Sequence, residues 1–502
     1  MDIEADCQSL VQGMEGDQLV QWAQAQLAQM DLGDSRRDER LGQLLAAMAR
    51  RPGKTLPEQC GSPASLKAAY RLLQCQEVQP ELILSSSAAA TVEQIRARHR
   101  QGVLLCIQDT TSLDYTSHPA MEGRGPISNS TSVRGFFAHS SLLVGGQGVV
   151  HGLLECEVYA RDEAAQKARK PGERNRQQAQ AKESARWLRS LEQSARLCEQ
   201  LPEAQSVINI ADREADMYEL FIQARQHHQA SDGRLHVLIR AQHDRQLHPK
   251  QKQEQEQQQV QARLWEHLAT QPAQARWSIH LPSAKGIHGQ QARQVEVLWQ
   301  RVRLEAPAHQ RKYHGAHEPL ELSVIMVREP VAPEGEQALE WVLLSSLEVD
   351  CEQQAQELVR WYALRWQIEV MHRIWKSGCR VEQRRFREAR AAQAMIVLDL
   401  LSAVLLLGLV TQSRHDPEAL AGPWLSDRQQ EVLRARFESE KTGTAGKPLK
   451  LAQAVRWISQ LAGHRGAPSS PPPGPEMLWR GLARLQDMEA GWLLSQMNQK
   501  CG

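Results

Sequence analysis

Two aspartates each follow a stretch of apolar residues that is long enough to form a buried strand. Asp109 follows VLLCIQ, and Asp212 follows SVINIA. Apolar runs of this length predict strands that are buried on both faces. An aspartate at the carboxyl end of such a strand points out of the sheet edge, where a ligand can reach it. Because hard divalent cations such as Mg²⁺ prefer carboxylate oxygens, two neighbouring strands would place both side chains on one metal ion.

A third carboxylate lies on a helix that is predicted over residues 352–374. Four polar residues of this segment fall within an arc of roughly 80° at about 100° per residue: Tyr362, Arg365, Glu369 and Lys376. The adjacent face is apolar and is expected to be buried. One helix face would therefore present a carboxylate beside a phenol, a guanidinium and an ammonium group.

Each of these residues has a simpler explanation when it is considered alone. An aspartate after a strand can be a turn or N-cap residue, and the sequence DREAD slightly favours that explanation for Asp212. Arg365 and Glu369 can form an ordinary i,i+4 ion pair, which contributes only tenths of a kcal/mol. The presence of all three carboxylates in one chain favours the metal site.

The size and composition of the chain set wide limits on its class. With 502 residues it exceeds the length at which a single core stops growing, about 250 to 300 residues, so two or three domains are expected. Its 41% hydrophobic and 24% charged residues are typical of folded soluble proteins. The nine cysteines contain no C-x-x-C pair, which argues against a zinc knuckle or a disulfide framework. The acidic first ten residues lack the features of an export signal, so a cytoplasmic location is expected.

One apolar stretch, residues 394–410, approaches the length of a membrane span. Asp399 and Ser402 interrupt it. Because a charge at bilayer depth is costly, the stretch predicts a buried core helix, and no membrane partner is expected.

Basic residues are concentrated locally, although the net charge of the whole chain is only +1. Lys and Arg must cluster if a chain of this net charge is to bind nucleic acid phosphates. One cluster contains Lys167, Arg169, Lys170, Arg174 and Arg176, and a second contains Arg373, Lys376, Arg380, Arg384, Arg385, Arg387 and Arg390. Either cluster can instead be an ordinary solvated face.

Residues 1–80 predict a domain of short helices. Asp34 can cap the helix that follows it, and Arg36 and Arg40 are one turn apart on the same face of that helix. This face could contact a DNA groove, or it could be a charged exterior.

From residue 101 onward the pattern changes to the element order β-β-β-α-β-α-β, which predicts an α/β fold with a mixed sheet and helices on its faces, as in ribonuclease-H-like domains. We expect this catalytic domain to span residues 81–395. A separate β-strand insertion is expected at about 242–350, after a polar Gln-rich loop. Residues 396–502 are predicted to form a helical C-terminal domain.

Three motifs in the same order resemble those of the insertion-sequence family 4 transposases, most closely the transposon-five type. They are QDTTSLDY around Asp109, ADREADMYEL around Asp212, and the Y-x2-R-x3-E-x6-K pattern from Tyr362 to Lys376. Similarity also covers LGDSRRDERL, GFFAHSSLL and WVLLSSLEV, so it extends over most of the chain.

This resemblance implies a DDE transposase, which is a divalent-metal-dependent DNA nuclease and strand transferase. Asp109, Asp212 and Glu369 would bind Mg²⁺, with Mn²⁺ able to substitute. The resemblance also implies DNA contacts for Arg36, Arg40, Phe137, Arg240, Trp341, Tyr362, Arg365 and Lys376. Trp341 would line the pocket for a flipped base, although from the sequence it could equally be a core residue of the β region. Phe136 and Phe137 stand where the family has two tryptophans, and a phenyl ring can still wedge into a base stack.

The expected partners are double-stranded DNA of the transposon end and target DNA, and the C-terminal domain would mediate a homodimer in the synaptic complex. The expected location is the nucleoid in the cytoplasm. The expected reaction cleaves both strands at the transposon end through a hairpin and joins the 3′ ends to target DNA. Two alternatives remain open: a metal-dependent nuclease on the same fold, and an inactive DNA-binding descendant.

Overall fold

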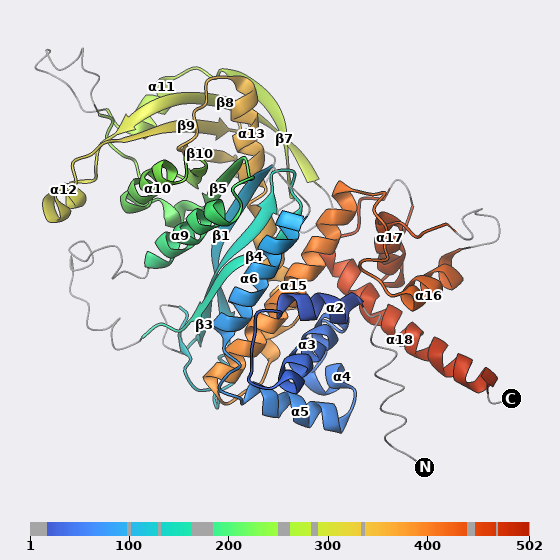
Figure 1. Cartoon of the computed structure of the whole chain (residues 1–502). Coiled ribbons are helices and arrows are strands. Elements are labelled where there is room, and N and C mark those ends of the chain that lie inside the picture. Colours follow the sequence, from blue (N-terminus) through green and yellow to red (C-terminus); the bar gives the residue numbers. More distant parts are fainter. Residues whose placement is uncertain are drawn as a thin grey trace, which may run out of the picture.

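The strand that carries Asp109 is an interior strand of a mixed sheet, between β3 and β5 (Figure 1). The strands of this half of the sheet are β1 (Val103–Asp114), β2 (Gly125–Pro126), β3 (Arg134–Gly145), β4 (Val150–Tyr159), β5 (Ser206–Ala211) and β6 (Leu235–Arg240). β1 pairs antiparallel with β3, which in turn pairs with β4. On its other edge β1 pairs parallel with β5, and β5 pairs parallel with β6. Apart from the two-residue β2, this is the element order that the sequence predicts, and a large mixed sheet is confirmed.

The computed structural model describes most of the chain. The described residues are 18–97, 102–128, 132–162, 184–248, 262–282, 290–332, 337–438, 447–467 and 470–500. The first basic cluster, the Gln-rich loop and part of the Pro-rich segment near residue 470 lie outside them.

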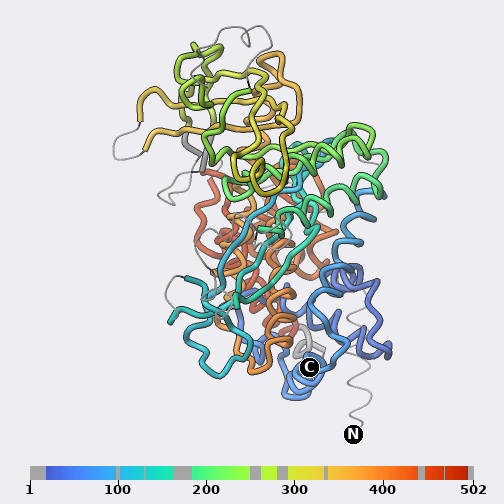
Figure 2. The backbone as a smooth tube through the Cα atoms, turned by 90° about the vertical axis from the view of Figure 1, so that its left-hand side faces the viewer, coloured from blue at the N-terminus to red at the C-terminus, as the bar shows by residue number. Residues whose placement is uncertain are grey.

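The predicted β insertion continues the central sheet, so the expectation of a separate β region is wrong. Its strands are β7 (Ala275–Pro282), β8 (Gln290–Leu304), β9 (Leu320–Arg328) and β10 (Glu340–Ser345). β10 pairs antiparallel with β6, with Leu343 opposite Arg240, and β9, β8 and β7 follow outward. Hydrogen bonding across that junction joins the strands of the described residues into one ten-stranded sheet. Figure 2 shows β7 to β9 in yellow at one end of the molecule and the first helices in blue at the other.

Helices cover both faces of the central strands, which explains why β1 and β5 are apolar without alternation. Leu104 and Cys106 pack in one cluster with α9 (Ala185–Gln200) and α10 (Tyr218–Ala230). Leu105 and Ile107 pack on the opposite face, in the cluster that contains α15 (Ala389–His415). Because side chains alternate along a strand, residues after Ile107 with odd numbers also belong to the α15 face.

The apolar stretch that the sequence predicts as a core helix lies within α15. This helix is long and apolar enough to cross a membrane, but 89% of its most apolar window is buried inside the protein. Asp399, in the middle of α15, accepts two hydrogen bonds of 2.7 Å from the Arg384 guanidinium. Burial raises the pKa of Asp399, and the Arg384 charge opposes that rise. The charge within the apolar stretch is therefore neutralised inside the protein.

The N-terminal helices form a small body against the end of α15. They are α2 (Gln18–Gln26), α3 (Ser35–Arg50), α4 (Leu56–Cys60) and α5 (Pro63–Leu73), followed by α6 (Pro80–Ala97), which packs on β4. As predicted, Asp34 caps α3, because its carboxylate accepts a hydrogen bond of 2.9 Å from Arg36 N. Gly53 approaches the catalytic half so closely that an added Cβ would lie 2.2 Å from Gly378 O.

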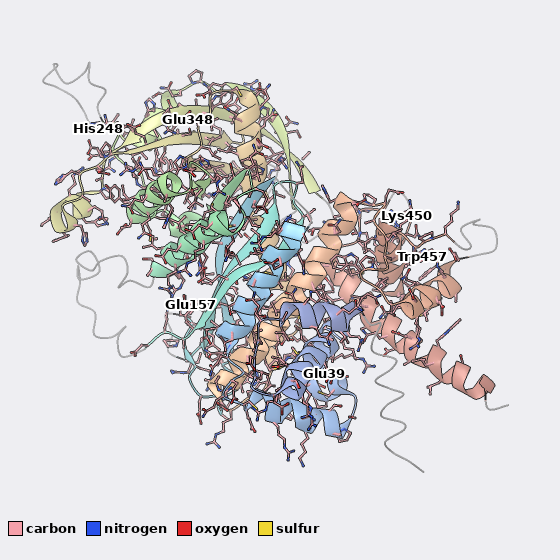
Figure 3. The ribbon with its side chains drawn as sticks, viewed as in Figure 1. Glu39, Glu157, His248, Glu348, Lys450 and Trp457 are labelled. Atoms are coloured by element: carbon pink, nitrogen blue, oxygen red, sulfur yellow. The ribbon has the colours of Figure 1, made fainter. Side chains whose placement is uncertain are left out.

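The C-terminal helices are α16 (Asp427–Phe437), α17 (Leu451–Leu461) and α18 (Pro475–Lys500). Trp457 stacks on Phe437 with ring centroids 5.9 Å apart and joins α17 to α16 (Figure 3). α18 also contacts α15 and α3. The predicted boundary at residues 395/396 falls inside α15, which is one continuous helix, so the C-terminal helices and the catalytic half share this element.

The ion pair between Asp399 and Arg384 gives a first testable prediction. Asp399→Ala removes the partner of a guanidinium whose side chain is only 7% exposed. Breaking a buried pair in this way costs about 3 to 5 kcal/mol, so the thermal unfolding midpoint should fall by several degrees. Glu476→Ala is the matched control, because its pair with Arg480 is half-exposed and contributes about 1 kcal/mol or less. Equal midpoints for the two variants would contradict the role of this pair.

Candidate active site

The two aspartates lie next to each other because β1 and β5 are paired in register. The parallel pairing matches Ile107 with Ile210, so the positions two residues further on are Asp109 and Asp212. Both aspartates therefore fall on the α15 face of the sheet, as Ile107 and Ile210 do. One detail of the prediction is wrong: β1 continues to Asp114, because β3 still pairs with it after β5 has ended. Asp109 thus stands where the parallel pairing ends, within a strand that is held on its other edge.

The aspartate after β5 also has a capping role. Asp212 accepts a hydrogen bond of 3.0 Å from Glu214 N and caps the 3₁₀ turn Arg213–Ala215. The second aspartate of the same motif has a different environment. Asp216 is 2% exposed, pairs with Arg245 at 2.5 Å, and accepts hydrogen bonds from two backbone N–H groups. Asp216 therefore holds the chain after β6, and sequence reasoning did not single it out.

The third carboxylate lies on a helix that is shorter than predicted. In place of one helix, the chain forms α13 (Glu352–Ala363), α14 (Trp366–Arg373) and a π-helical turn (Ile374–Gly378). α14 packs against β1 and brings Glu369 to the aspartate face of the sheet. The break at Leu364 and the π turn mean that the predicted single arc of polar residues is not continuous.

The Arg365 guanidinium joins the carboxylates of the sheet and the helix. Its Nη1 lies 3.6 Å from Asp109 Oδ2, and its Nη2 donates a hydrogen bond to Glu369 Oε1. Arg365 also interacts electrostatically with Asp212. The Arg365 guanidinium therefore interacts with all three predicted carboxylates.

The ionisation of Asp109 reflects this crowding. Burial raises the pKa of Asp109 to about 7, the Arg365 charge opposes the rise, and Asp212 and Glu369 add to it. Asp212 and Glu369 are thus both within electrostatic reach of Asp109. A cation in this position would relieve the repulsion.

A second basic group and two aromatic rings border the carboxylates. Tyr362 is 4% exposed, interacts electrostatically with Arg240, and meets the Trp341 ring edge-on with centroids 5.0 Å apart. Burial lowers the pKa of Arg240, and the nearby Tyr362 opposes that shift. Trp341 is 8% exposed. The structure therefore places Arg240, Tyr362 and Trp341 beside Arg365, with Trp341 packed in the core of this region.

Lys376 lies apart from the three carboxylates. It belongs to the π turn. Burial lowers the pKa of Lys376, and the nearby carboxylates of Glu382 and Asp114 oppose that shift. Asp114 is the last residue of β1, and its N–H donates a hydrogen bond of 2.9 Å to Glu382. The ammonium group thus lies near the end of β1, five residues beyond Asp109.

Two buried histidines near Asp109 were not predicted. His372 Nδ1 lies 4.0 Å from Asp109 Oδ2, and His139 hydrogen bonds with Thr110 at 2.8 Å. Burial lowers the pKa of each histidine to about 3, so both are neutral at neutral pH. The three-residue spacing of Glu369 and His372 on one helix could have indicated the first of them.

The two neighbouring phenylalanines on β3, Phe136 and Phe137, differ in how far they are buried. Phe136 is fully buried against Tyr115, so it is not available to wedge into a base stack, and that expectation is wrong for this residue. Phe137 is half-buried, stacks on Tyr159, and lies 4.1 Å below the Arg161 guanidinium. Three residues of strand separate Phe137 from the position opposite Asp109, which is about 10 Å.

The predicted DNA-facing arginines also divide into two groups. Arg36 and Arg40 are exposed on α3. In the second basic cluster, however, Arg384 pairs with buried Asp399, and Arg390 donates hydrogen bonds to backbone carbonyls of residues 73, 74, 75 and 78. These two side chains hold the fold together, which leaves fewer charges of that cluster for a phosphate backbone.

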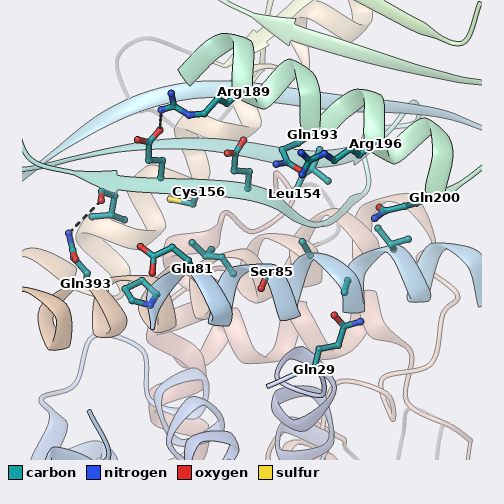
Figure 4. A pocket seen from close by; sticks show the side chains of 18 residues that line it. Gln29, Glu81, Ser85, Leu154, Cys156, Arg189, Gln193, Arg196, Gln200 and Gln393 are labelled. Carbon is teal, nitrogen blue, oxygen red and sulfur yellow. Dashed lines mark hydrogen bonds and ion pairs between the residues drawn. The ribbon is translucent and has the colours of Figure 1, made fainter. Parts of the chain in front are cut away.

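A sizeable cavity lies away from the carboxylates. It has a volume of about 530 Å³ and lies between α6, β4 and α9 (Figure 4). Glu157 in its wall is paired with Arg189, and Glu155 accepts a hydrogen bond from Ser190. Burial raises the pKa of the Cys156 thiol in this wall to about 12. The cavity therefore offers no activated nucleophile and is not the candidate active site.

The carboxylates fit a hard divalent cation in their chemistry, but the guanidinium lies where the cation would bind. Among the described residues, no group of three or more His, Cys, Asp and Glu side chains is gathered closely enough to hold a metal ion. The reason lies in the contacts already given: the Arg365 fork stands between the carboxylates of Asp109 and Glu369. Three oxygen-bearing ligands on two rigid elements otherwise match the preference of Mg²⁺.

Two protein families match this chain. The family described as transposase DNA-binding matches residues 20–78, and the family described as transposase DDE domain matches residues 179–405. The second match includes Asp212 and Glu369 and begins after Asp109. A solved structure, a cryo-EM structure of the piggyBac transposase synaptic complex with hairpin DNA, matches 86% of this chain and 84% of that chain at 11% identity, with a TM-score of 0.33. A likeness that low has no bearing on this chain.

The two matched families and the acidic sheet edge define the class of protein: an enzyme that binds DNA, cleaves its strands and transfers them. The chain is a DDE transposase, with the DNA-binding domain before the catalytic sheet. Enzymes with this catalytic domain generally use divalent metal ions.

The DREAD motif allows catalytic and structural aspartates to be separated. Asp216→Ala leaves Arg245 buried without its partner, and the loss should be about 3 to 5 kcal/mol of unfolding free energy. Asp212→Ala removes only a cap, which contributes about 1 to 2 kcal/mol at most, and it also removes a repulsive charge. Thermal unfolding of both variants measures the difference. A larger loss for Asp212→Ala would mean that its role is mainly structural.

Proposed function

We propose that this DDE transposase works by cut and paste, as the transposon-five type of insertion-sequence family 4 does, with Asp109, Asp212 and Glu369 as the ligands of two Mg²⁺ ions. Mn²⁺ would substitute for Mg²⁺ in the same ligand set. One observation carries the proposal: two aspartates in register on one sheet face meet a helix glutamate through a shared guanidinium. The order of the three motifs along the chain supports the subfamily.

The chain's own residues position the DNA end for phosphoryl transfer. Asp109, Asp212 and Glu369 would hold the two cations, which would activate the attacking oxygen and stabilise the leaving oxygen. Arg365 and Arg240 border the carboxylates and can hold phosphates of the DNA end by paired N–H donors. The hydrogen bond of Arg240 to Glu340 O holds this guanidinium beside Tyr362, and Lys376 offers a further ammonium at the end of β1.

In this proposal water cuts one strand, and the freed 3′-OH attacks the opposite strand to form a hairpin. A second water opens the hairpin, and the 3′-OH then attacks target DNA. Flipping a base near the cut costs a few kcal/mol, and stacking on an aromatic ring returns about 1 to 3 kcal/mol. Trp341 would need to turn from Tyr362 toward the base to serve in this way, because it is 8% exposed here. Phe137 is the second candidate ring, but it pairs opposite Ser112 and therefore points to the α9 face of the sheet, not to the face of the carboxylates.

In this proposal the N-terminal and C-terminal helices bind the partners of the enzyme, which are the transposon end and a second copy of the chain. Arg36 and Arg40 are exposed on α3, within the matched DNA-binding domain, and would read the transposon end. α18 exposes Leu493 and Leu494, whose exposed fractions are 37% and 64%, and would pair two chains in the synaptic complex. The enzyme would act on DNA of the nucleoid in the cytoplasm.

The experiment that tests the proposal measures Mg²⁺-dependent cleavage and joining on a plasmid that carries the element's own ends. Asp109→Asn, Asp212→Asn and Glu369→Gln should each lower the rate more than about a hundredfold, because even outer partners of metal ligands cost 10- to 100-fold. Glu357→Gln is the matched control, since this exposed glutamate pairs with Arg360 on α13, away from the three carboxylates. DNA binding, measured by gel mobility, should persist in all four variants.

The products of the same assay separate the proposed activity from its alternatives. Hairpin ends on denaturing gels, followed by joined products, support the cut-and-paste reaction. Cleavage without joining would identify a nuclease, and binding without Mg²⁺-dependent cleavage would identify an inactive descendant. Cleavage that survives any of the three carboxylate substitutions would refute the ligand assignment.

A further inference from the structure

We infer that Arg365 is a built-in counter-ion that closes the metal site until a DNA phosphate draws its guanidinium away, so that DNA binding precedes tight metal binding. This inference rests on the proposed function, because it concerns the same three carboxylates. It adds that DNA binds before the metal ions, and that Arg365 pairs first with the carboxylates and then with a DNA phosphate.

The first partner is visible in the contacts of the guanidinium. Its two terminal nitrogens reach different carboxylates, Asp109 at 3.6 Å and Glu369 by a hydrogen bond. The side chains are largely enclosed, with exposed fractions of 15% for Arg365, 19% for Asp109 and 28% for Glu369. A guanidinium stays charged at all physiological pH values and has a fixed planar fork. The fork therefore bridges the two elements that must share a metal.

A divalent cation and this guanidinium exclude each other at the carboxylates. The oxygen of Glu369 that accepts the hydrogen bond from Arg365 is an oxygen that a metal would need. Like charges within about 4 Å repel strongly in a partly buried site. Either the metal binds weakly while Arg365 stays, or Arg365 leaves before the metal is held by all three ligands.

The second partner follows from the surroundings of Arg365. Arg240 lies close enough to interact with Arg365 electrostatically, and its Nη2 donates a hydrogen bond of 2.8 Å to Glu340 O. Two guanidinium groups at one edge of an acidic site suit a phosphate, which accepts paired N–H donors. Arg365 stands at the break between α13 and α14, outside the regular turns of either helix. When a phosphate binds at this edge, Arg365 pairs with the phosphate, and the metal replaces Arg365 at the carboxylates.

The test measures Mn²⁺ binding to the full-length chain by calorimetry, without DNA and without any turnover. Arg365→Gln removes the charge and leaves a shorter polar side chain, so Mn²⁺ should bind at least tenfold more tightly than to the unmodified chain, which corresponds to 1.4 kcal/mol. Arg360→Gln is the matched control, because this exposed arginine on α13 donates a hydrogen bond to Gly146 O and should leave Mn²⁺ affinity unchanged. Equal or weaker binding to Arg365→Gln would overturn the inference.

A second measurement uses the unmodified chain, so it does not depend on how the variant folds. A short linear duplex at low ionic strength binds through its phosphates regardless of sequence. This duplex should tighten Mn²⁺ binding, and by linkage Mn²⁺ should tighten duplex binding by the same factor. In Arg365→Gln the factor should shrink. An undiminished factor would overturn the inference.

The carboxylate variants separate this inference from the proposed function. Asp109→Asn and Glu369→Gln should weaken Mn²⁺ binding severely with and without DNA. If they do so while Arg365→Gln leaves the affinity unchanged, the ligand set stands and the counter-ion role fails. If they leave Mn²⁺ binding intact, the ligand set itself fails.

Discussion

Asp109 lies within electrostatic reach of Asp212 and Glu369 at the edge of the central sheet, and the repulsion among these carboxylates must be balanced by a cation. Burial and the neighbouring acids raise the pKa of Asp109 to about 7, while Arg365 acts in the opposite direction. Like charges at such separations disfavour one another's ionised forms. In a transposase of this type the balancing charge has two possible sources, an arginine of the chain or divalent metal ions. The chemistry of the site depends on which of them is present.

The rest of the fold keeps the carboxylates together against that repulsion. Two-sided burial holds β1 and β5 in register, and β3 keeps β1 paired beyond the point where β5 ends. α14 rests on β1, and α15 anchors the following segment through the pair of Asp399 and Arg384. The close approach of Gly53 to Gly378 ties the DNA-binding helices to the end of the catalytic helix. The packing of these elements thus offsets the electrostatic repulsion among the carboxylates.

The sequence predicts the strands and the three carboxylates because both depend on local patterns. Apolar runs followed by Asp109 and Asp212 gave two strands, and period-two alternation would also have placed both side chains on one face once the register was known. The register itself, the break at Leu364 and the continuity of β6 with β10 depend on pairing between distant segments. The buried partners His372 and Asp216 were missed for the same reason, because their roles come from tertiary contacts. For the second basic cluster the sequence left a DNA contact and a solvated face open, and Arg384 and Arg390 instead serve the core.

The central claim is that Asp109, Asp212 and Glu369 share divalent ions when DNA is bound. Anomalous diffraction from crystals of a DNA complex grown with Mn²⁺ tests it most directly. The account predicts Mn²⁺ peaks about 2.1 Å from carboxylate oxygens of all three residues, with the Arg365 guanidinium moved onto a phosphate. Mn²⁺ peaks that none of these carboxylates reaches, in a complex with DNA ends in place, would contradict it.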